Sequence, residues 1–511
     1  MSDQSVFDLL RSDERLVVVE APAGCGKTFQ GAAYAHDIAP TLKRGRMLIL
    51  THTNAACDVF AERTKGLIGK KVEIRTIDAM ISQIASAYHQ ALGLPADLSV
   101  WAYANNGFPL LASKVAELLA ANPMISVALG RRYPVIVCDE HQDASPDHHA
   151  IIMSLFAGGA KLRIFGDRMQ SIYERHPRAA ALHRERWENL VNQSVHDELD
   201  TPHRWQREAE GCSELGSWVL EARERLLADG IIDLTRALPP TVQVIFSDNI
   251  ARNRGGYLAV RNDRQPIDRC LDRSNQMFVL ASNNALVQSL RAFWRRRVPI
   301  WEGHTRNALS KLVADIQVAT GNASEVANCL ILFMEAVGVG FTEASHGRTL
   351  KSEIQNGCKK VRTGKPGSIQ VLAKFLTDQP SHVGLARAIA KIGTFIDNRA
   401  PGFADVKIDQ HREFWESQRL SEFEDPAKAY AEISMKRTIL RPKPRPKSLA
   451  TVHKAKGLEC DNVMIMHCDR ASFGDTVYGR CKLYVALSRA KSSVTLVIPR
   501  TDHSPLFRVR Q

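Results

Sequence analysis

A short glycine-rich segment, APAGCGKT at residues 21–28, constrains the fold of this 511-residue chain more than any other feature. It follows the apolar run RLVVVE and precedes a helical pattern, so it joins a buried strand to a helix. Loops close to the pattern GxxxxGK[ST] wrap backbone N–H groups around phosphates at a helix N-terminus. The sequence therefore predicts a phosphate-binding loop made of Ala21, Pro22, Ala23, Gly24, Cys25, Gly26, Lys27 and Thr28, with Ala21 in place of the first glycine.

The end of this loop and a second motif suit a nucleoside triphosphate bound with Mg²⁺. The Lys27 ammonium can reach the β- and γ-phosphates, and the Thr28 hydroxyl can bind the metal. In VIVCDEHQD, four apolar residues lead to Asp139 and Glu140 at the end of an expected strand. Because ligands bind outside the carboxyl ends of parallel strands, we expect Asp139 to hold Mg²⁺ and Glu140 to activate the attacking water.

Runs rich in Val, Ile and Leu recur between helical patterns, which is typical of strands buried on both faces of a parallel sheet. The first set lies at 15–21, 46–53, 71–77, 133–140 and 161–167, and the second at 241–247, 276–282, 447–453, 460–467 and 493–499. The sequence therefore predicts an α/β fold with two parallel-sheet domains.

Two mainly helical segments are expected to interrupt these domains. They lie at 81–130 and 301–447, and the second ends in RPKPRPK, whose alternating prolines favour an extended linker. The predicted domains are 1–80 with 131–198, and 199–300 with 448–511.

APAGCGKT and DEHQD together resemble the motifs of the UvrD/Rep-type superfamily 1 helicases, and further matches follow in the family's order. They are LTHTNAA (50–56), RTIDAM (75–80), FGDRMQSIYE (165–174), LDTPHRW (199–205), TVHKAKGLECDNV (451–463) and LYVALSRAK (483–491). The resemblance implies two RecA-like P-loop motor domains, each with a mainly helical insertion. It also implies an ATP- and Mg²⁺-dependent helicase or translocase that moves 3′ to 5′ on single-stranded DNA, or acts at DNA ends.

By this resemblance, the ATP site takes side chains from both domains. Gln170 and Arg204 are expected at the γ-phosphate and His203 at the nucleobase, while Gly457 and Glu459 complete the pocket. Arg489 is expected to reach across a cleft and stabilise the charge that develops on the γ-phosphoryl group. The predicted catalytic residues are Lys27, Glu140, Gln170, Arg204 and Arg489.

The resemblance also implies a DNA path, but the sequence departs from the family there. The expected DNA-binding residues are His52, Thr53, Asn54, Thr76, Tyr173, Arg175, Thr451 and His453. Arg175 stands where a base-stacking aromatic residue is usual, and His52, Asp78 and Cys460 replace a common Phe, His and Phe. Since His and Arg planes stack on bases more weakly than Trp or Phe, these changes weaken the expectation of strand separation but not of ATP hydrolysis.

The composition fits a nucleic-acid partner. Lys and Arg number 68 against 55 Asp and Glu, a net charge of +13, which suits a polyanion. Two basic clusters could each follow a phosphate backbone. The alternative for RAFWRRR (291–297) is the solvated basic face of a helix over a buried Trp. The alternative for RPKPRPK (441–447) is an exposed linker.

The chain carries no signal for a membrane, an export route or a structural metal. It has no apolar run long enough to span a bilayer and no leader-like N-terminus, so we expect a cytoplasmic protein without a membrane partner. Its ten cysteines lack a CxxC pair, so we expect reduced, mostly buried thiols.

A second interpretation stays open, in which the chain is an ATPase that senses DNA and works with a separate nuclease subunit. Its compact size and altered stacking positions resemble the helicase-like subunit of Gabija-type bacterial anti-phage systems. Few residues follow Arg489, so we expect no nuclease domain in this chain. Unwinding by the isolated chain would favour the motor, whereas DNA-stimulated hydrolysis without unwinding would favour the sensor; DNA repair and phage defence both remain open as pathways.

Overall fold

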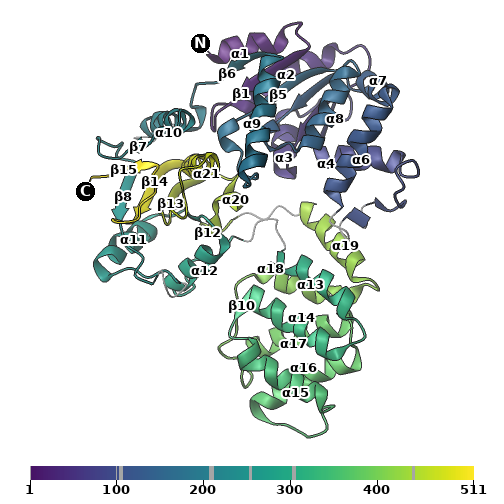
Figure 1. Cartoon of the computed structure of the whole chain (residues 1–511), viewed down its shortest axis with the longest axis vertical. Helices are drawn as coiled ribbons and strands as arrows, with labels where there is room; N and C mark the ends of the chain where they lie inside the picture. The colour runs from purple at the N-terminus through teal and green to yellow at the C-terminus, as the bar shows by residue number, and fades with distance from the viewer. Residues whose placement is uncertain are drawn as a thin grey trace. The chain divides into compact units, whose positions relative to one another are not determined.

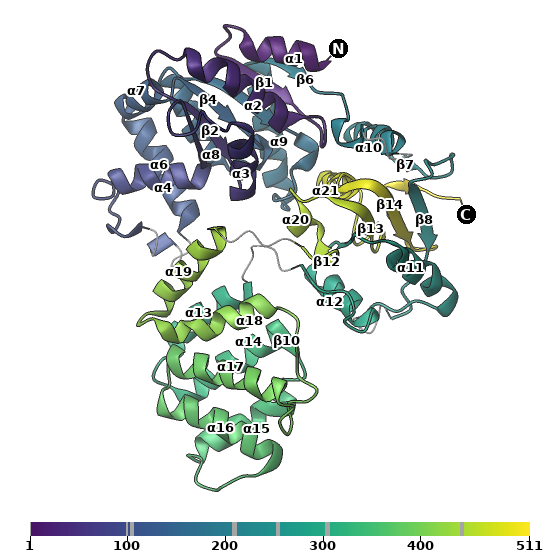
Figure 2. The same ribbon diagram turned by 180° about the vertical axis from the view of Figure 1, so that it is seen from behind.

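The computed structural model describes residues 2–98, 101–102, 107–206, 212–251, 256–301, 307–439 and 444–510. The chain divides into two compact units. Unit 1 consists of Met1–Leu92, Leu110–Trp301 and Lys443–Gln511, and it contains both large β-sheets. Unit 2 consists of Gly93–Pro109 and Glu302–Pro442, and it is mainly helical. Figures 1 and 2 show each unit from two sides.

The first sheet has the strand order β3-β2-β4-β5-β1-β6, and all of its pairings are parallel. Its strands are β1 (Leu16–Glu20), β2 (Met47–Thr51), β3 (Val72–Thr76), β4 (Val135–Cys138), β5 (Lys161–Gly166) and β6 (Val195–Glu198). Val17 and Val19 pack in one core with α1 (Ser2–Arg11), α2 (Lys27–Ile38) and α3 (Asn54–Arg63). Val18 points to the opposite face and is also buried, which explains why the strand reads as a continuous apolar run.

Among the described residues, five more helices connect the strands of the first sheet. They are α4 (Ile77–Ala87), α6 (Phe108–Ala121), α7 (Pro123–Arg132), α8 (Pro146–Ala157) and α9 (Pro177–Asn192). Among the described residues, no single helix is long and apolar enough to cross a membrane, although α6 and α7, bent by 100° at the break between them, pass as a pair by length and composition.

The second sheet has the order β12-β9-β13-β14-β8, again with parallel pairings throughout. Its strands are β8 (Val242–Phe246), β9 (Met277–Ala281), β12 (Lys447–Thr451), β13 (Cys460–Ile465) and β14 (Ala490–Ile498). Phe278 and Leu280 pack in a core with α10 (Cys212–Leu227) and α21 (Val477–Leu487). Val279 points the other way, toward α11 (Arg261–Arg273) and α12 (Asn284–Phe293). A short parallel pair, β7 (Ile232–Asp233) and β15 (Phe507–Arg508), lies outside this sheet.

Each of the ten strands predicted from apolar runs is present, and the α/β fold with two parallel sheets is confirmed. The sequence does not predict β6, whose residues VHDE are polar and mostly exposed. This segment is an edge strand that pairs only with β1 among the described strands, so its backbone hydrogen bonds, not apolar side chains, hold it. All ten cysteines are free, as expected.

Unit 2 is a helical bundle around one apolar core. Its helices are α13 (Asn307–Ala319), α14 (Ala323–Val337), α15 (Arg348–Gln355), α16 (Gly364–Asp378), α17 (His382–Asp397), α18 (His411–Gln418) and α19 (Pro426–Ile439). A two-residue antiparallel pair, β10 (Gly338–Val339) with β11 (Lys407–Ile408), is its one sheet among the described residues. Of the predicted linker RPKPRPK, residues 441–443 lie outside the described residues, and Lys447 already begins β12.

Candidate active site

The phosphate loop lies between β1 and α2, and two of its glycines have left-handed backbones. Gly24 has φ 81° and Gly26 has φ 84°, a conformation that side chains disfavour. A Cβ atom on Gly24 would lie 2.7 Å from the Trp205 ring, so the close approach of residues 203–205 also requires glycine there. Gly26 caps α2 without a side-chain hydrogen bond, which leaves the N-terminus of the helix open toward an anion.

Lys27, Asp139 and Glu140 meet in front of this loop. The Lys27 ammonium contacts the Glu140 carboxylate and lies 3.4 Å from Asp139 Oδ1. Asp139 and Glu140 directly follow β4, and Glu140 itself has a left-handed backbone at φ 55°. Burial raises the pKa of Asp139, whereas Lys27 holds the pKa of Glu140 low against the cost of burial. Glu140 is therefore an ionised base held at a strand end.

The residues predicted to bind Mg²⁺ offer ligands of a suitable kind. Asp139 is only 3% exposed, and its Oδ1 atom accepts no hydrogen bond. The Lys27 ammonium, 3.4 Å away, offsets part of the cost of burying this oxygen, and a bound cation would offset it further. Thr28, on the first turn of α2, adds a hydroxyl oxygen, and Mg²⁺ prefers oxygen ligands. The donor set thus fits Mg²⁺ held together with phosphate oxygens.

Two glutamines connect this acidic pair to residues of the second sheet. Gln142 donates from Nε2 to Glu140 and accepts from the Asp167 backbone N–H at 3.1 Å. Gln170 donates from Nε2 to Asp167 Oδ2 at 2.9 Å and accepts from Arg489 Nη2 at 3.1 Å. Arg489 follows α21, so a guanidinium from the second sheet's side lies in the same network as Glu140. Burial and the nearby Arg204 lower the pKa of Arg489 to about 10.

Residues 203–205 join the loop to the second sheet. Arg204 donates to the Ser488 carbonyl at 2.6 Å and pairs with Glu459 at 2.5 Å, so these two predicted pocket residues lie in contact. The Arg204 backbone N–H donates to the Gly24 carbonyl at 3.0 Å. His203 lies against Gly26, and its Nε2 atom is 2.5 Å from Asp3 Oδ2, which places α1 at the same end of the site.

Gly457 and its neighbour Lys456 follow the short helix α20 (Val452–Ala455). Lys456 binds Asp143 Oδ1 at 2.5 Å and the Gln170 carbonyl at 2.6 Å. Gly457 has φ 79°, and no heavy atom lies within 4 Å of the position its Cβ would take. The turn therefore needs glycine for its backbone conformation, not for lack of space.

Three threonines predicted to bind DNA are helix N-caps. Thr53, Thr76 and Thr451 begin α3, α4 and α20, and each side-chain hydroxyl accepts a backbone N–H of the first turn. Asn54 is the exposed first residue of α3. His52 lies beside His148, with ring centroids 5.9 Å apart, and burial lowers the pKa of His52 to about 4.

The other predicted DNA residues gather where both sheets contribute. Tyr173 is 56% exposed, with the Lys456 ammonium 5.0 Å above its ring and the His453 ring 6.5 Å away. His453 also meets the Tyr478 hydroxyl at 2.9 Å. Arg175 is exposed, and burial together with Arg175 lowers the pKa of His453 to about 4. This aromatic and basic group suits a nucleic acid strand, but each DNA role remains a prediction.

The aromatic residues of RAFWRRR do not offer a stacking surface. Phe293 and Trp294 are 4% and 2% exposed, and Trp294 donates to Asp268 Oδ1 at 2.8 Å. Arg297 pairs with Asp272 at 3.3 Å. This segment fits the alternative of a basic face over a buried Trp.

Sequence reasoning missed several members of the site. Tyr484 accepts the Ala23 N–H at 2.9 Å, and it could have been noticed within LYVALSRAK. Asp167 could have been noticed in FGDRMQ, and Lys456 in TVHKAKGLE. Arg223 lies in the charged stretch EARERL, which carries no motif, so nothing in the sequence marks it.

Two protein-family models match the chain. The model for the UvrD/REP helicase N-terminal domain matches residues 4–106 and 99–182. The model for the UvrD-like helicase C-terminal domain matches residues 448–497. These ranges contain the phosphate loop, Glu140 and Gln170 in the first match and Arg489 in the second. No curated protein matches the chain.

Proposed function

The chain belongs to the UvrD/Rep-type superfamily 1 helicases, and from this premise we propose that it hydrolyses ATP with Mg²⁺ and moves 3′ to 5′ along single-stranded DNA. ATP-dependent helicase activity is a general property of this family. The observation that carries the proposal is the hydrogen bond from Arg489 to Gln170, in one network with Glu140. It brings a guanidinium from the second sheet into contact with Gln170, which follows β5 of the first sheet.

Binding of the triphosphate rests on residues of the first sheet. The open N-terminus of α2 and the Lys27 ammonium attract the phosphates, and Lys27 would leave its carboxylate partners to do so. Thr28 and Asp139 would hold Mg²⁺, which neutralises charge on the β- and γ-phosphates. The His203 ring, which lies against Gly26, would contact the nucleobase.

Hydrolysis needs a base and a source of positive charge at the γ-phosphate. Glu140 is ionised and takes a proton from the attacking water. Gln170 orients the water or a γ-phosphate oxygen, while Arg204 and Arg489 stabilise the charge on the transferred group. Because Arg204 and Arg489 contact elements of the second sheet, hydrolysis is coupled to how the two sheets are held together.

Variants at Lys27 and Glu140 test the proposal. Lys27→Ala should abolish DNA-stimulated ATP hydrolysis by weakening phosphate binding, whereas Glu140→Gln should abolish hydrolysis and retain nucleotide. ATP turnover and the binding of a fluorescent nucleotide would be measured with and without single-stranded DNA. The exposed pair Glu62 and Lys65 provides matched controls, since Lys65→Ala and Glu62→Gln should keep parental activity. Near-parental turnover in Glu140→Gln would rule out Glu140 as the base.

One observation favours a second candidate function, a DNA-sensing ATPase that works with a separate nuclease subunit. Arg175 is exposed where a stacking aromatic residue is usual in the family, and a guanidinium grips single bases less firmly. DNA-stimulated ATP hydrolysis without unwinding of a duplex that carries a 3′ single-stranded tail would favour this sensor. Unwinding of long duplexes by the isolated chain would exclude it.

A further inference from the structure

Arg223 is a buried cation shared by the two sheets. It lies on α10, whose Leu215, Val219 and Leu226 pack in the core of the second sheet. Its own side chain is 1% exposed and turns toward the first sheet. There it meets Glu20 Oε1 at 2.7 Å, Glu198 Oε1 at 2.8 Å and Asp167 Oδ1 at 3.3 Å.

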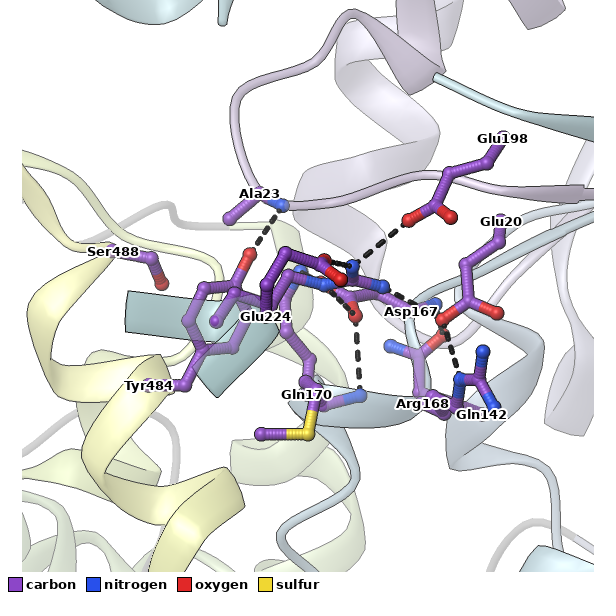
Figure 3. A network of polar contacts seen from close by, with 12 residues as sticks. Glu20, Ala23, Gln142, Asp167, Arg168, Gln170, Glu198, Glu224, Tyr484 and Ser488 are labelled. Carbon is purple, nitrogen blue, oxygen red and sulfur yellow. Dashed lines mark hydrogen bonds and ion pairs between the residues drawn. The ribbon is translucent and has the colours of Figure 1, made fainter. Parts of the chain in front are cut away.

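The partners of Arg223 stand at the carboxyl ends of three strands of the first sheet. Glu20 ends β1, Glu198 ends β6 and Asp167 follows β5, so one guanidinium reaches all three strand ends. Figure 3 shows these carboxylates drawn together, with Gln170 beside Asp167. Glu224 of α10 adds a fourth carboxylate contact at 2.6 Å. The planar guanidinium can donate to several acceptors at once, which an ammonium cannot match.

Asp167 determines which way two amide groups face. A primary amide has an acceptor on one side and donors on the other, and an ionised carboxylate can only accept. Because Asp167 Oδ2 accepts from Gln170 Nε2, the Gln170 oxygen is left for Arg489. Because the Asp167 N–H occupies Gln142 Oε1, the Gln142 nitrogen is left for Glu140.

Asp167 is 0% exposed, and a buried carboxylate is costly unless a cation lies beside it. Arg223 supplies that cation. Without it, the buried Asp167 carboxylate would turn toward water. The Gln170 amide would then lose the acceptor that fixes its orientation.

We propose that Arg223 is a positioning residue for ATP hydrolysis, which fixes the Asp167 carboxylate and, through Gln170, the orientation of Arg489. The proposal rests on the proposed function of this site. Because α10 packs in the core of the second sheet, the position of Arg223 depends on that sheet. The orientation of Gln170 beside the first sheet therefore also depends on the second sheet.

The test compares Arg223→Gln and Arg223→Lys with the parent in steady-state ATP hydrolysis with saturating single-stranded DNA. We expect Arg223→Gln to lower kcat by roughly 10- to 100-fold, because small misplacements of catalytic groups have effects of this size. The KM for ATP should stay within about 3-fold of the parental value. Arg223→Lys should recover part of kcat, because lysine restores the charge but not the shared contacts. In a Gln170→Ala background, Arg223→Gln should cause little further loss, since both act on one arrangement.

Two control variants separate positioning from a merely structural role. Arg168 also pairs with Glu20, at 3.0 Å, but forms no ion pair with Asp167 in the described part of the chain, so Arg168→Gln should keep kcat. Arg225→Gln removes an ion pair with Glu221 on the surface of the same helix, and this variant should also keep the parental kcat. If Arg223→Gln does not fold, Arg223→Lys carries the test.

Three outcomes would overturn the proposal: parental kcat in the Arg223 variants, an equal loss in Arg168→Gln, or full additivity with Gln170→Ala. A parent protein without any ATP hydrolysis would instead refute the proposed function, so the two failures are distinguishable.

Discussion

Glu140, the proposed catalytic base, has an unfavourable backbone conformation. Its left-handed conformation, φ 55° and ψ 38°, costs about 1–2 kcal/mol for a residue with a Cβ atom. Replacing Glu140 with glycine would remove this backbone strain, but it would also remove the carboxylate. The turn instead presents Glu140 to Lys27 and Gln142 immediately after the buried strand β4.

Tyr484 has a hydroxyl on which the phosphate loop depends. The side chain is fully buried, and its oxygen accepts the Ala23 N–H at 2.9 Å. Tyr484→Phe would remove that acceptor from a buried N–H group, so we expect the free energy of unfolding to fall by roughly 1–3 kcal/mol. Urea denaturation measures this change in the free energy of unfolding. Tyr88→Phe, at a ring that is 38% exposed, should change stability by less than about 0.5 kcal/mol, and an equal effect in both variants would contradict the assignment.

A buried histidine and two half-buried ones beside the acidic motif make stability depend on pH. His141 Nε2 lies 3.0 Å from His149 Nδ1. Burial and nearby cations lower the pKa of His149 and His183 to about 4 and that of His141 well below its usual value. Since the unfolded chain binds more protons below pH 6.5, stability is fully present above about pH 6.5 and falls as the pH drops toward 4.

The expected pH effect is measured as the free energy of unfolding between pH 7.5 and 5. His149→Gln removes one of these titrating rings and keeps a side chain that can form hydrogen bonds. Its stability should therefore decline less steeply than that of the parent over this interval. Identical slopes in the two proteins would exclude a contribution from His149.

At the scale of elements, helix capping and DNA contact make different demands on the same hydroxyls. Thr53 and Thr76 cap α3 and α4, and the family resemblance also places them on the DNA path. Aspartate caps helices as well as threonine does, but it repels phosphate. Thr76→Asp should keep the melting temperature and weaken single-stranded DNA binding by roughly 5-fold, as about 1 kcal/mol of repulsion implies.

Thr76→Ala is the matched variant for this prediction. It should cost about 1 kcal/mol of stability through the lost cap. DNA affinity from fluorescence anisotropy and stability from thermal denaturation would be compared for both variants. Parental DNA affinity in Thr76→Asp would mean that Thr76 only caps α4.

At the scale of the whole molecule, the net charge of +13 predicts DNA binding that weakens steeply with salt. Replacing Arg175, the exposed cation near His453 and Tyr478, should make this dependence shallower. We expect Arg175→Trp to reduce the slope of log affinity against log salt by about 0.7, the value for one phosphate contact on a single strand. It should also raise unwinding per ATP hydrolysed, because an indole stacks on bases more firmly.

Binding titrations at several salt concentrations measure this slope. Arg44→Trp, at an exposed position of the loop before β2, is the control for lost charge and added aromatic surface. If Arg175→Trp and Arg44→Trp change the slope equally, Arg175 does not lie on the DNA path.

The sequence alone was sufficient to predict the two sheets, and it also brings together the residues of the proposed ATP site. Strands buried on both faces are largely apolar, so β1, β2, β4 and β9 could be predicted from their apolar runs. Lys27, Asp139 and Glu140 lie next to such strands, and their local motif predicts that they face the same end of the sheet.

Only the tertiary structure decided which distant residues complete that site. Edge strand β6 has no apolar pattern, and Arg223 lies in a helix whose charges look like a solvated face. Arg223 reaches Glu20 and Asp167, which are 203 and 56 residues away in the chain. Local patterns record which face of an element is buried, whereas a shared buried charge depends on where folding brings the ends of several strands and a helix together.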